Sequence, residues 1–161
     1  MSSLPGSPVS YEELYKEPFY GDGLRFSCTR CSACCRYESG FVFLSKKDVF
    51  ILAAALQMEY NKVIETYCRW VPGTMRAEWL SLKETAEYDC IFWKDGCSVY
   101  EGRPIQCRTF PFWSSILVSP DAWSRTAVFC PGMGSGRLYT KDEIELWVSR
   151  QRAESLISRN I

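Results

Sequence analysis

Four cysteines stand within eight residues near the start of this 161-residue chain, in the run FSCTRCSACCRY, and the chain contains no histidine. Thiolates are soft donors that suit zinc, Cu(I) and iron–sulfur clusters, whereas calcium and magnesium prefer oxygen ligands. Four more cysteines follow in the second half, and Cys68 stands apart between the two groups. The count predicts two four-thiolate sites and one spare cysteine, with these candidate metal ligands: Cys28, Cys31, Cys34, Cys35, Cys90, Cys97, Cys107 and Cys130.

Length and composition are those of one small folded domain, since 47% of the residues are hydrophobic. The 19 basic and 19 acidic side chains balance, which predicts no nucleic-acid partner. No segment approaches the ~20 apolar residues of a membrane span, and the polar start MSSLPGSPVSYEELYKEP lacks the pattern of a secretion signal. We therefore expect a cytoplasmic protein with no membrane partner, in a compartment where clustered cysteines are more often metal ligands or catalysts than disulfides.

The spacing of the first cysteines is typical of a metal-binding loop. Cys28, Cys31 and Cys34 follow two successive C-x-x-C steps, as at the opening of a bacterial ferredoxin run, whose fourth cysteine is missing at that spacing. Cys130, followed by proline, is a candidate for the remote fourth ligand. Neighbouring side chains of extended backbone point to opposite sides, so we expect Cys34 and Cys35 to point apart, with Cys35 toward the second-half cysteines. The alternatives are a structural metal clip without activity, small buried hydrophobes, or a disulfide pair.

Two arginines flank the cysteine of YEGRPIQCRTFPF. Arg103 and Arg108 stand on either side of Cys107 between two prolines, and we expect them to neutralise cluster charge or to bind an anionic ligand bidentately. The alternative is a pair of surface arginines that pack their stems on aromatic rings. Cys68, in TYCRW, is predicted to be a buried free thiol. Catalysis by a Cys–His pair is excluded because no histidine exists to act as the base.

Periodicity and capping signals predict an α+β fold, a single small domain with short strands and cysteine loops around one or two thiolate metal sites and helices packed outside. Ser45, with Asp48 three residues on, is predicted to cap one helix, and a capping box formed by Thr140 and Glu143 is predicted to open the last helix, which runs to about Ser158. A short helix is expected at 59–68. Strands are expected at 36–44 and 78–83, as a hairpin of 90–93 with 97–100, and as a pair of 113–119 with 125–129.

These elements predict three parts of the chain. Residues 1–22 form an extended lead-in, residues 23–138 form the cysteine-cluster domain, and residues 139–161 form a C-terminal helix that packs on the same domain.

The order CTRCSACC, then DCIFWKDGCSVYEGRPIQCRTFPF, then CPG resembles the YkgJ-like CxxCxxCC cysteine-cluster family over roughly residues 25–133. That family is described as zinc- or iron-chelating, is similar to the metal-binding part of flagellin lysine methylases, and has members described as containing an iron–sulfur cluster. The resemblance implies metal binding by the eight cysteines given above and leaves the reaction open.

The leading hypothesis is a cytosolic protein that binds metal through cysteine alone, with an iron–sulfur cluster, [4Fe–4S] in type, or zinc as its cofactor. Such a cluster would serve electron transfer or a protein-modification reaction. The alternatives are a zinc-stabilised interaction module without catalysis and an enzyme like the protein-lysine methylases. The expected partner is an unidentified protein or a small anionic ligand near Arg103 and Arg108.

Overall fold

The structure of the protein is a computed structural model that describes residues 17–73 and 76–160. This part of the chain has the predicted α+β fold, with five α-helices and two small antiparallel sheets. The helices are α2 (Lys46–Leu56), α3 (Tyr60–Tyr67), α4 (Ile105–Thr109), α5 (Pro120–Phe129) and α6 (Lys141–Ala153). The strands are β1 (Leu24–Phe26), β2 (Cys68–Pro72), β3 (Ala77–Leu82), β4 (Arg137–Tyr139) and β5 (Ser158–Asn160), and two 3-10 turns are η1 (Ala33–Cys35) and η2 (Tyr100–Gly102).

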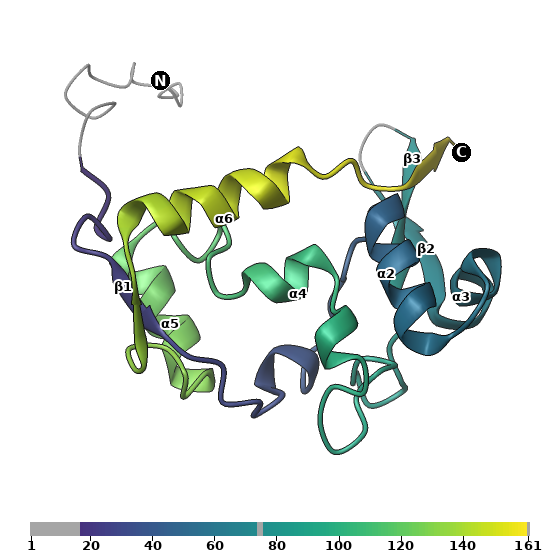
Figure 1. Cartoon of the computed structure of the whole chain (residues 1–161), viewed down its shortest axis with the longest axis horizontal. Helices are drawn as coiled ribbons and strands as arrows, with labels where there is room; N and C mark the ends of the chain where they lie inside the picture. The colour runs from purple at the N-terminus through teal and green to yellow at the C-terminus, as the bar shows by residue number, and fades with distance from the viewer. Residues whose placement is uncertain (1–16, 74–75, 161) are drawn as a thin grey trace, which may run out of the picture.

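Two hydrophobic cores lie at opposite ends of the molecule (Figure 1). In the first core, α2 and α3 pack with the sheet β2-β3-β5, and Leu44, Leu52 and Leu80 are buried there. In the second core, Phe26 of β1 and Ile144 of α6 pack with residues around α5, beside the sheet β1-β4. The apolar side chains thus form two separate cores, and the chain segments between them form a junction.

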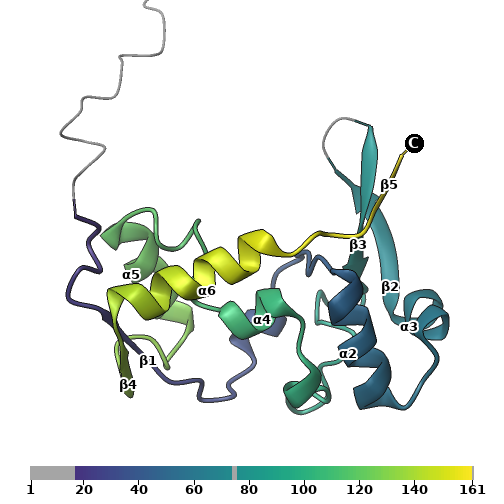
Figure 2. The ribbon, with the colours of Figure 1, turned by 45° about the horizontal axis from the view of Figure 1, so that its top comes forward.

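Three connections cross this junction. The run from Cys28 to Cys35 links β1 to the segment that enters α2, and α4 lies between the two cores in both ribbon views (Figures 1 and 2). The chain after α6 also crosses, because Ile157 donates its N–H to Leu44 O at 2.8 Å and accepts from Leu80 N at 2.9 Å. The four cysteines of the first loop and Cys107 of α4 therefore lie in the middle of the molecule, between the two cores.

Local capping chemistry forms the helices as predicted. The Ser45 side chain accepts from Asp48 N while the Asp48 carboxylate accepts from Ser45 N, so α2 begins in a full capping box. Thr140 and Glu143 form the same box at the start of α6. The predicted short helix after residue 59 and the strand at 78–83 are confirmed as α3 and β3.

The predicted strand pair at 113–119 and 125–129 is wrong, because residues 120–129 form α5. The Ser119 side chain accepts from Ala122 N and Pro120 takes the first helical position, a strong helix start. The last helix is also shorter than predicted. It ends at Ala153, since extended backbone at Glu154 frees residues 158–160 to pair with β3 as β5.

The predicted strand at 36–44 is wrong, since only a single bridge joins Phe43 to Ser81. Two backbone N–H groups of this segment donate to side chains and not to a neighbouring strand. Gly40 N donates to the Glu84 carboxylate, and Val42 N donates to Ser81 Oγ.

The predicted hairpin at 90–100 is likewise reduced to one bridge between Trp93 and Cys97 around a turn in which Asp95 and Gly96 have positive φ. Most of the expected lead-in, residues 1–16, lies outside the described residues, and none of the described helices is both long and apolar enough to cross a membrane.

Candidate metal centre

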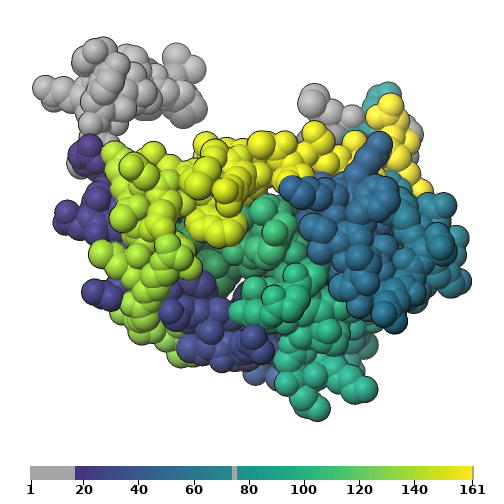
Figure 3. Space-filling model, in the orientation of Figure 1, coloured from purple at the N-terminus to yellow at the C-terminus, as the bar shows by residue number. Residues whose placement is uncertain are grey.

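The loop of the first four cysteines turns sharply on itself. Arg30, Ser32 and Tyr37 adopt positive φ angles of 57°, 64° and 76°, which residues other than glycine seldom do. Such turns wrap the loop around one centre instead of extending it. In the space-filling view the surface is hollowed between this purple to blue loop and the green residues around α4 (Figure 3).

Second-half cysteines reach this loop from three other segments. Cys90 donates its N–H to Cys35 O at 2.8 Å, which joins the two groups directly. Cys107 lies on α4, and Cys130 is buried in the second core at the end of α5. Cys97 packs at the edge of the first core.

Cys34 lies within Coulomb range of the cysteines of all these segments. Burial is the main cause that raises the pKa of the thiols of Cys90, Cys97, Cys107 and Cys130, and negative charge on Cys34 raises each of them further. Coulomb interactions weaken with distance, so a sulfur that acts on cysteines from all the other segments lies among them. The structure thus brings together thiols that are widely separated in sequence.

Cys34 and Cys35 do not point apart, and this prediction was wrong. Their sulfurs lie 3.7 Å apart, because both residues belong to the η1 turn and not to extended backbone. The hydrogen that they share lowers the pKa of Cys34 to about 7 and raises the pKa of Cys35. Charges on Cys90 and Cys107 raise the Cys35 pKa further, so Cys35 does lie near the second-half thiols as expected.

Backbone amides are directed at several of these sulfurs. Each such N–H opposes the effect of burial and favours the thiolate, which is the form that binds metal. The donors are Phe92 to Cys90, Val99 to Cys97, and Gly132 and Met133 to Cys130. A buried disulfide has no need of such donors, and all nine cysteines are free thiols.

The cysteine sulfurs of the junction are suitable ligands for a thiophilic metal, although they do not surround a single ion. With metal–sulfur bonds of ~2.3 Å, two ligands of a tetrahedral ion lie about 3.8 Å apart, close to the separation of Cys34 and Cys35. Within residues 17–73 and 76–160, however, no three cysteine, aspartate or glutamate side chains converge closely enough to hold one ion. A third ligand to the same ion would require a side chain to rotate.

Arg103 lies beside these thiols, as its predicted role requires. Its Nε donates to Tyr100 O at 2.7 Å and its guanidinium lies 3.6 Å from the centroid of the Tyr100 ring. Its positive charge lowers the pKa of Cys34, Cys97 and Cys107 against the larger effect of burial at the last two. The guanidinium therefore favours thiolates in this group.

Arg108 stands in the last turn of α4, one residue after Cys107. Its side chain is half-buried, and its Nε is buried with no hydrogen-bond acceptor among the described residues. A bound group at the junction would supply such an acceptor. The predicted role of Arg108 remains a prediction.

Sequence reasoning missed the ion pair that holds the cysteine loop to the second-half segment. Arg36 Nε donates to Asp89 Oδ1 at 3.0 Å, and the same guanidinium lies 3.6 Å from the centroid of the Trp93 ring. Arg36 directly follows Cys35 in the sequence and Asp89 directly precedes Cys90, and opposite charges next to two candidate ligands are the signal that could have identified the pair.

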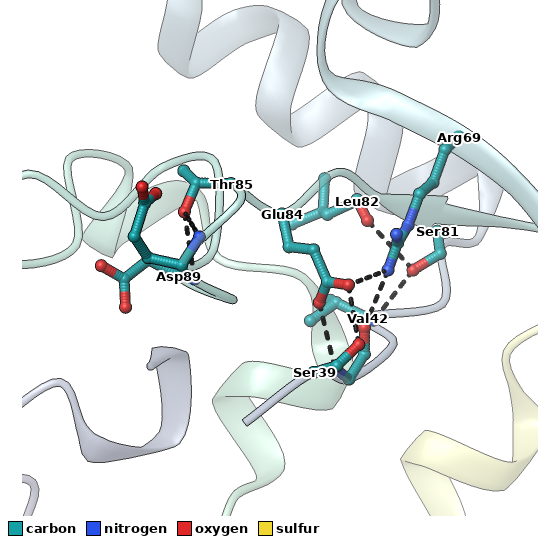
Figure 4. Close-up of polar contacts among 10 residues, drawn as sticks. Ser39, Val42, Arg69, Ser81, Leu82, Glu84, Thr85 and Asp89 are labelled. Carbon is teal, nitrogen blue, oxygen red and sulfur yellow. Dashed lines mark hydrogen bonds and ion pairs between the residues drawn. The ribbon is translucent and has the colours of Figure 1, made fainter. Parts of the chain in front are cut away.

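A second polar network ties the end of the loop to the sheet (Figure 4). The Glu84 carboxylate accepts from Ser39 Oγ at 2.7 Å and from Gly40 N at 3.1 Å, and it pairs with Arg69 of β2 at 2.9 Å. The end of the cysteine loop is therefore fixed to the first core through side chains.

Cys68 lies elsewhere, as predicted. It is 6% exposed in the first core, where its thiol is 3.8 Å from Val63 O. Burial raises its pKa to about 11, against the lesser effect of Lys83.

Comparison with known proteins places the chain in a family. Residues 27–131 match the model of the family CxxCxxCC, described as "Putative zinc- or iron-chelating domain", and this match covers more than half of the chain. The protein therefore belongs to the CxxCxxCC family, as the cysteine pattern predicts. It is also 25% identical over 151 residues to the uncharacterized protein MJ0661 of Methanocaldococcus jannaschii, a match that covers 89% of this chain and 77% of that protein. No solved structure matches.

Proposed function

We propose that this protein holds an iron–sulfur cluster on the cysteine thiolates of the junction and uses it in electron transfer or in support of a protein-modification reaction. Family membership supports the coarser statement, binding of zinc or iron. The candidate ligands remain the four cysteines of the loop and the four of the second half.

One observation carries the choice of a cluster over a single ion. Charge on Cys34 acts on Cys90, Cys97, Cys107 and Cys130, yet no three cysteine, aspartate or glutamate side chains of the described residues converge closely enough to hold one ion. In a cluster each iron takes its own cysteine, so the ligands stand farther apart than those of a single ion. The observed spread of thiols suits that wider arrangement.

The surroundings of the sulfurs fit a redox group. A cluster exchanges one electron, and hydrogen bonds to its sulfurs and nearby charge set its reduction potential. Here backbone N–H groups donate to Cys90, Cys97 and Cys130, and Arg103 brings positive charge to the same group. These groups stabilise negative charge on the sulfurs and would favour the reduced state.

The second candidate is a zinc-stabilised module without catalysis. The 3.7 Å separation of Cys34 and Cys35 favours it, since that is the ligand spacing of one tetrahedral ion. In this candidate the zinc ion is bound by four protein ligands and has a structural role.

Anaerobic purification followed by iron, zinc and sulfide analysis, with a visible spectrum before and after dithionite, separates the two candidates. The proposal expects iron and acid-labile sulfide and a visible absorption that dithionite bleaches. Cys34→Ser should remove it, while the control Cys68→Ser should leave it intact. Colourless protein with stoichiometric zinc and no iron would overturn the proposal in favour of the structural module.

A further inference from the structure

Two arginines from distant parts of the chain lie over one aromatic ring beside the metal centre. The guanidinium carbon of Arg103 is 3.6 Å from the centroid of the Tyr100 ring, and that of Arg30 is 4.2 Å from the same point. Arg30 comes from the cysteine loop, between Cys28 and Cys31, whereas Tyr100 and Arg103 come from the second half. The two cations are therefore held no farther apart than these two separations combined.

This arrangement holds two like charges close together. Neither Arg30 nor Arg103 forms an ion pair with a carboxylate in the part of the chain that the structure describes. The charge of Arg103 acts on neighbouring thiols, and Arg30 is exposed. Two such cations repel each other, and a bound anion would relieve the repulsion.

The unused donors give this site its selectivity. Among the described residues Arg103 forms one hydrogen bond, from Nε to Tyr100 O, and its terminal nitrogens have no acceptor there. Stacking on an aromatic ring orients a guanidinium and reduces the entropy lost when it binds. The planar fork of a guanidinium matches the two oxygens of a carboxylate or a phosphate.

We propose that Arg30 and Arg103, held on the Tyr100 ring, form a binding site for the oxyanion group of a small molecule next to the metal centre. The ligand class is a carboxylate or a phosphate, whose oxygens accept charge-assisted hydrogen bonds from these guanidinium groups. The site goes beyond metal binding, and it rests on the proposed centre only because a bound metal would hold the cysteine loop in position.

Isothermal titration calorimetry on protein purified with its metal tests the site, with inorganic phosphate and citrate as separate probes in a buffer of low ionic strength. The variants are R30Q and R103Q. The matched control is R150Q, which removes one exposed arginine that also lies over an aromatic ring, Trp147, at 5.4 Å. Metal content is measured in every sample, so that loss of the metal and loss of the anion are read separately.

We expect at least one probe to bind wild type and R150Q equally, and R30Q and R103Q about tenfold more weakly, the loss of one charge-assisted hydrogen bond. Binding of phosphate alone or of citrate alone would identify the oxyanion. If R103Q loses its metal, R30Q decides, because its exposed side chain is not expected to hold the centre. No binding to wild type at millimolar probe, or equal binding to R30Q and R150Q in metal-loaded samples, would overturn the proposal.

Discussion

Asp48 links the start of one helix to the helix that carries a candidate ligand, and its replacement by asparagine should destabilise the protein strongly. The carboxylate is 1% exposed. Its Oδ2 accepts from Ser45 N at 3.0 Å and from Ser45 Oγ at 2.8 Å, and its Oδ1 accepts from Ile105 N at 2.7 Å. Ile105 begins α4, the helix of Cys107. One side chain thus completes a capping box and fixes α4 against α2.

The expected cost follows from these three hydrogen bonds. Asparagine has one acceptor oxygen, so its NH₂ must face the N–H of either Ser45 or Ile105. A buried hydrogen bond to a charged group contributes about 1.5–3 kcal/mol, and a donor left without a partner costs a similar amount. Asp48→Asn should therefore lower the free energy of unfolding by about 3 kcal/mol.

Chemical denaturation followed by circular dichroism measures this loss, and the metal content of each sample is measured beside it. The matched control is Glu143→Gln, which alters the same kind of capping box in α6 but on an exposed side chain, and its effect should be much smaller. Asp48→Asn should also reduce the metal content, because α4 positions Cys107. If the two variants lose equal stability, the buried hydrogen bond from Ile105 N to Asp48 does not stabilise the protein, and the expected cost of Asp48→Asn is wrong.

Two further results are expected. The buried thiol of Cys68, whose pKa is raised to about 11, should react with iodoacetamide far more slowly in the folded than in the denatured protein. The stability that its neutral form contributes should decline as pH rises from 9.0 through 11. Rapid alkylation of the folded protein at neutral pH would contradict this expectation. Gly132→Ala should lower the free energy of unfolding by about 1–3 kcal/mol in urea denaturation, since its Cβ would meet the Ser27 carbonyl oxygen. The control Gly40→Ala should leave the free energy of unfolding unchanged, because nothing lies within 4 Å of its Cβ. Equal stabilities of the two variants would show that the backbone around Gly132 shifts without cost.

Features that depend on a few neighbouring residues could be predicted from the sequence. The capping boxes at Ser45 and Thr140 are of this kind, because every group that forms them lies within four residues. Burial of Cys68 also followed from its aromatic surroundings. The cysteine pattern alone was enough to predict the family.

Features that depend on distant partners could not be predicted. The alternating residues at 36–44 are held by Ser81 and Glu84, which only the fold brings near. The η1 turn, which sets the sulfurs of Cys34 and Cys35 side by side, has no signal in the spacing itself. Arg30 meets the Tyr100 ring across about 70 residues of chain, so no local pattern indicates that these two side chains are in contact.

Metal and sulfide analysis of anaerobically purified protein, made on wild type, Cys34→Ser and Cys68→Ser together, is the most direct test of a thiolate metal centre at the junction. We predict iron with acid-labile sulfide in wild type. Cys34→Ser should lose it, because Cys34 acts on thiols of all the other segments, and Cys68→Ser should retain it. Equal metal content in all three proteins, or protein that folds fully with no iron or zinc at all, would contradict a thiolate metal centre at the junction.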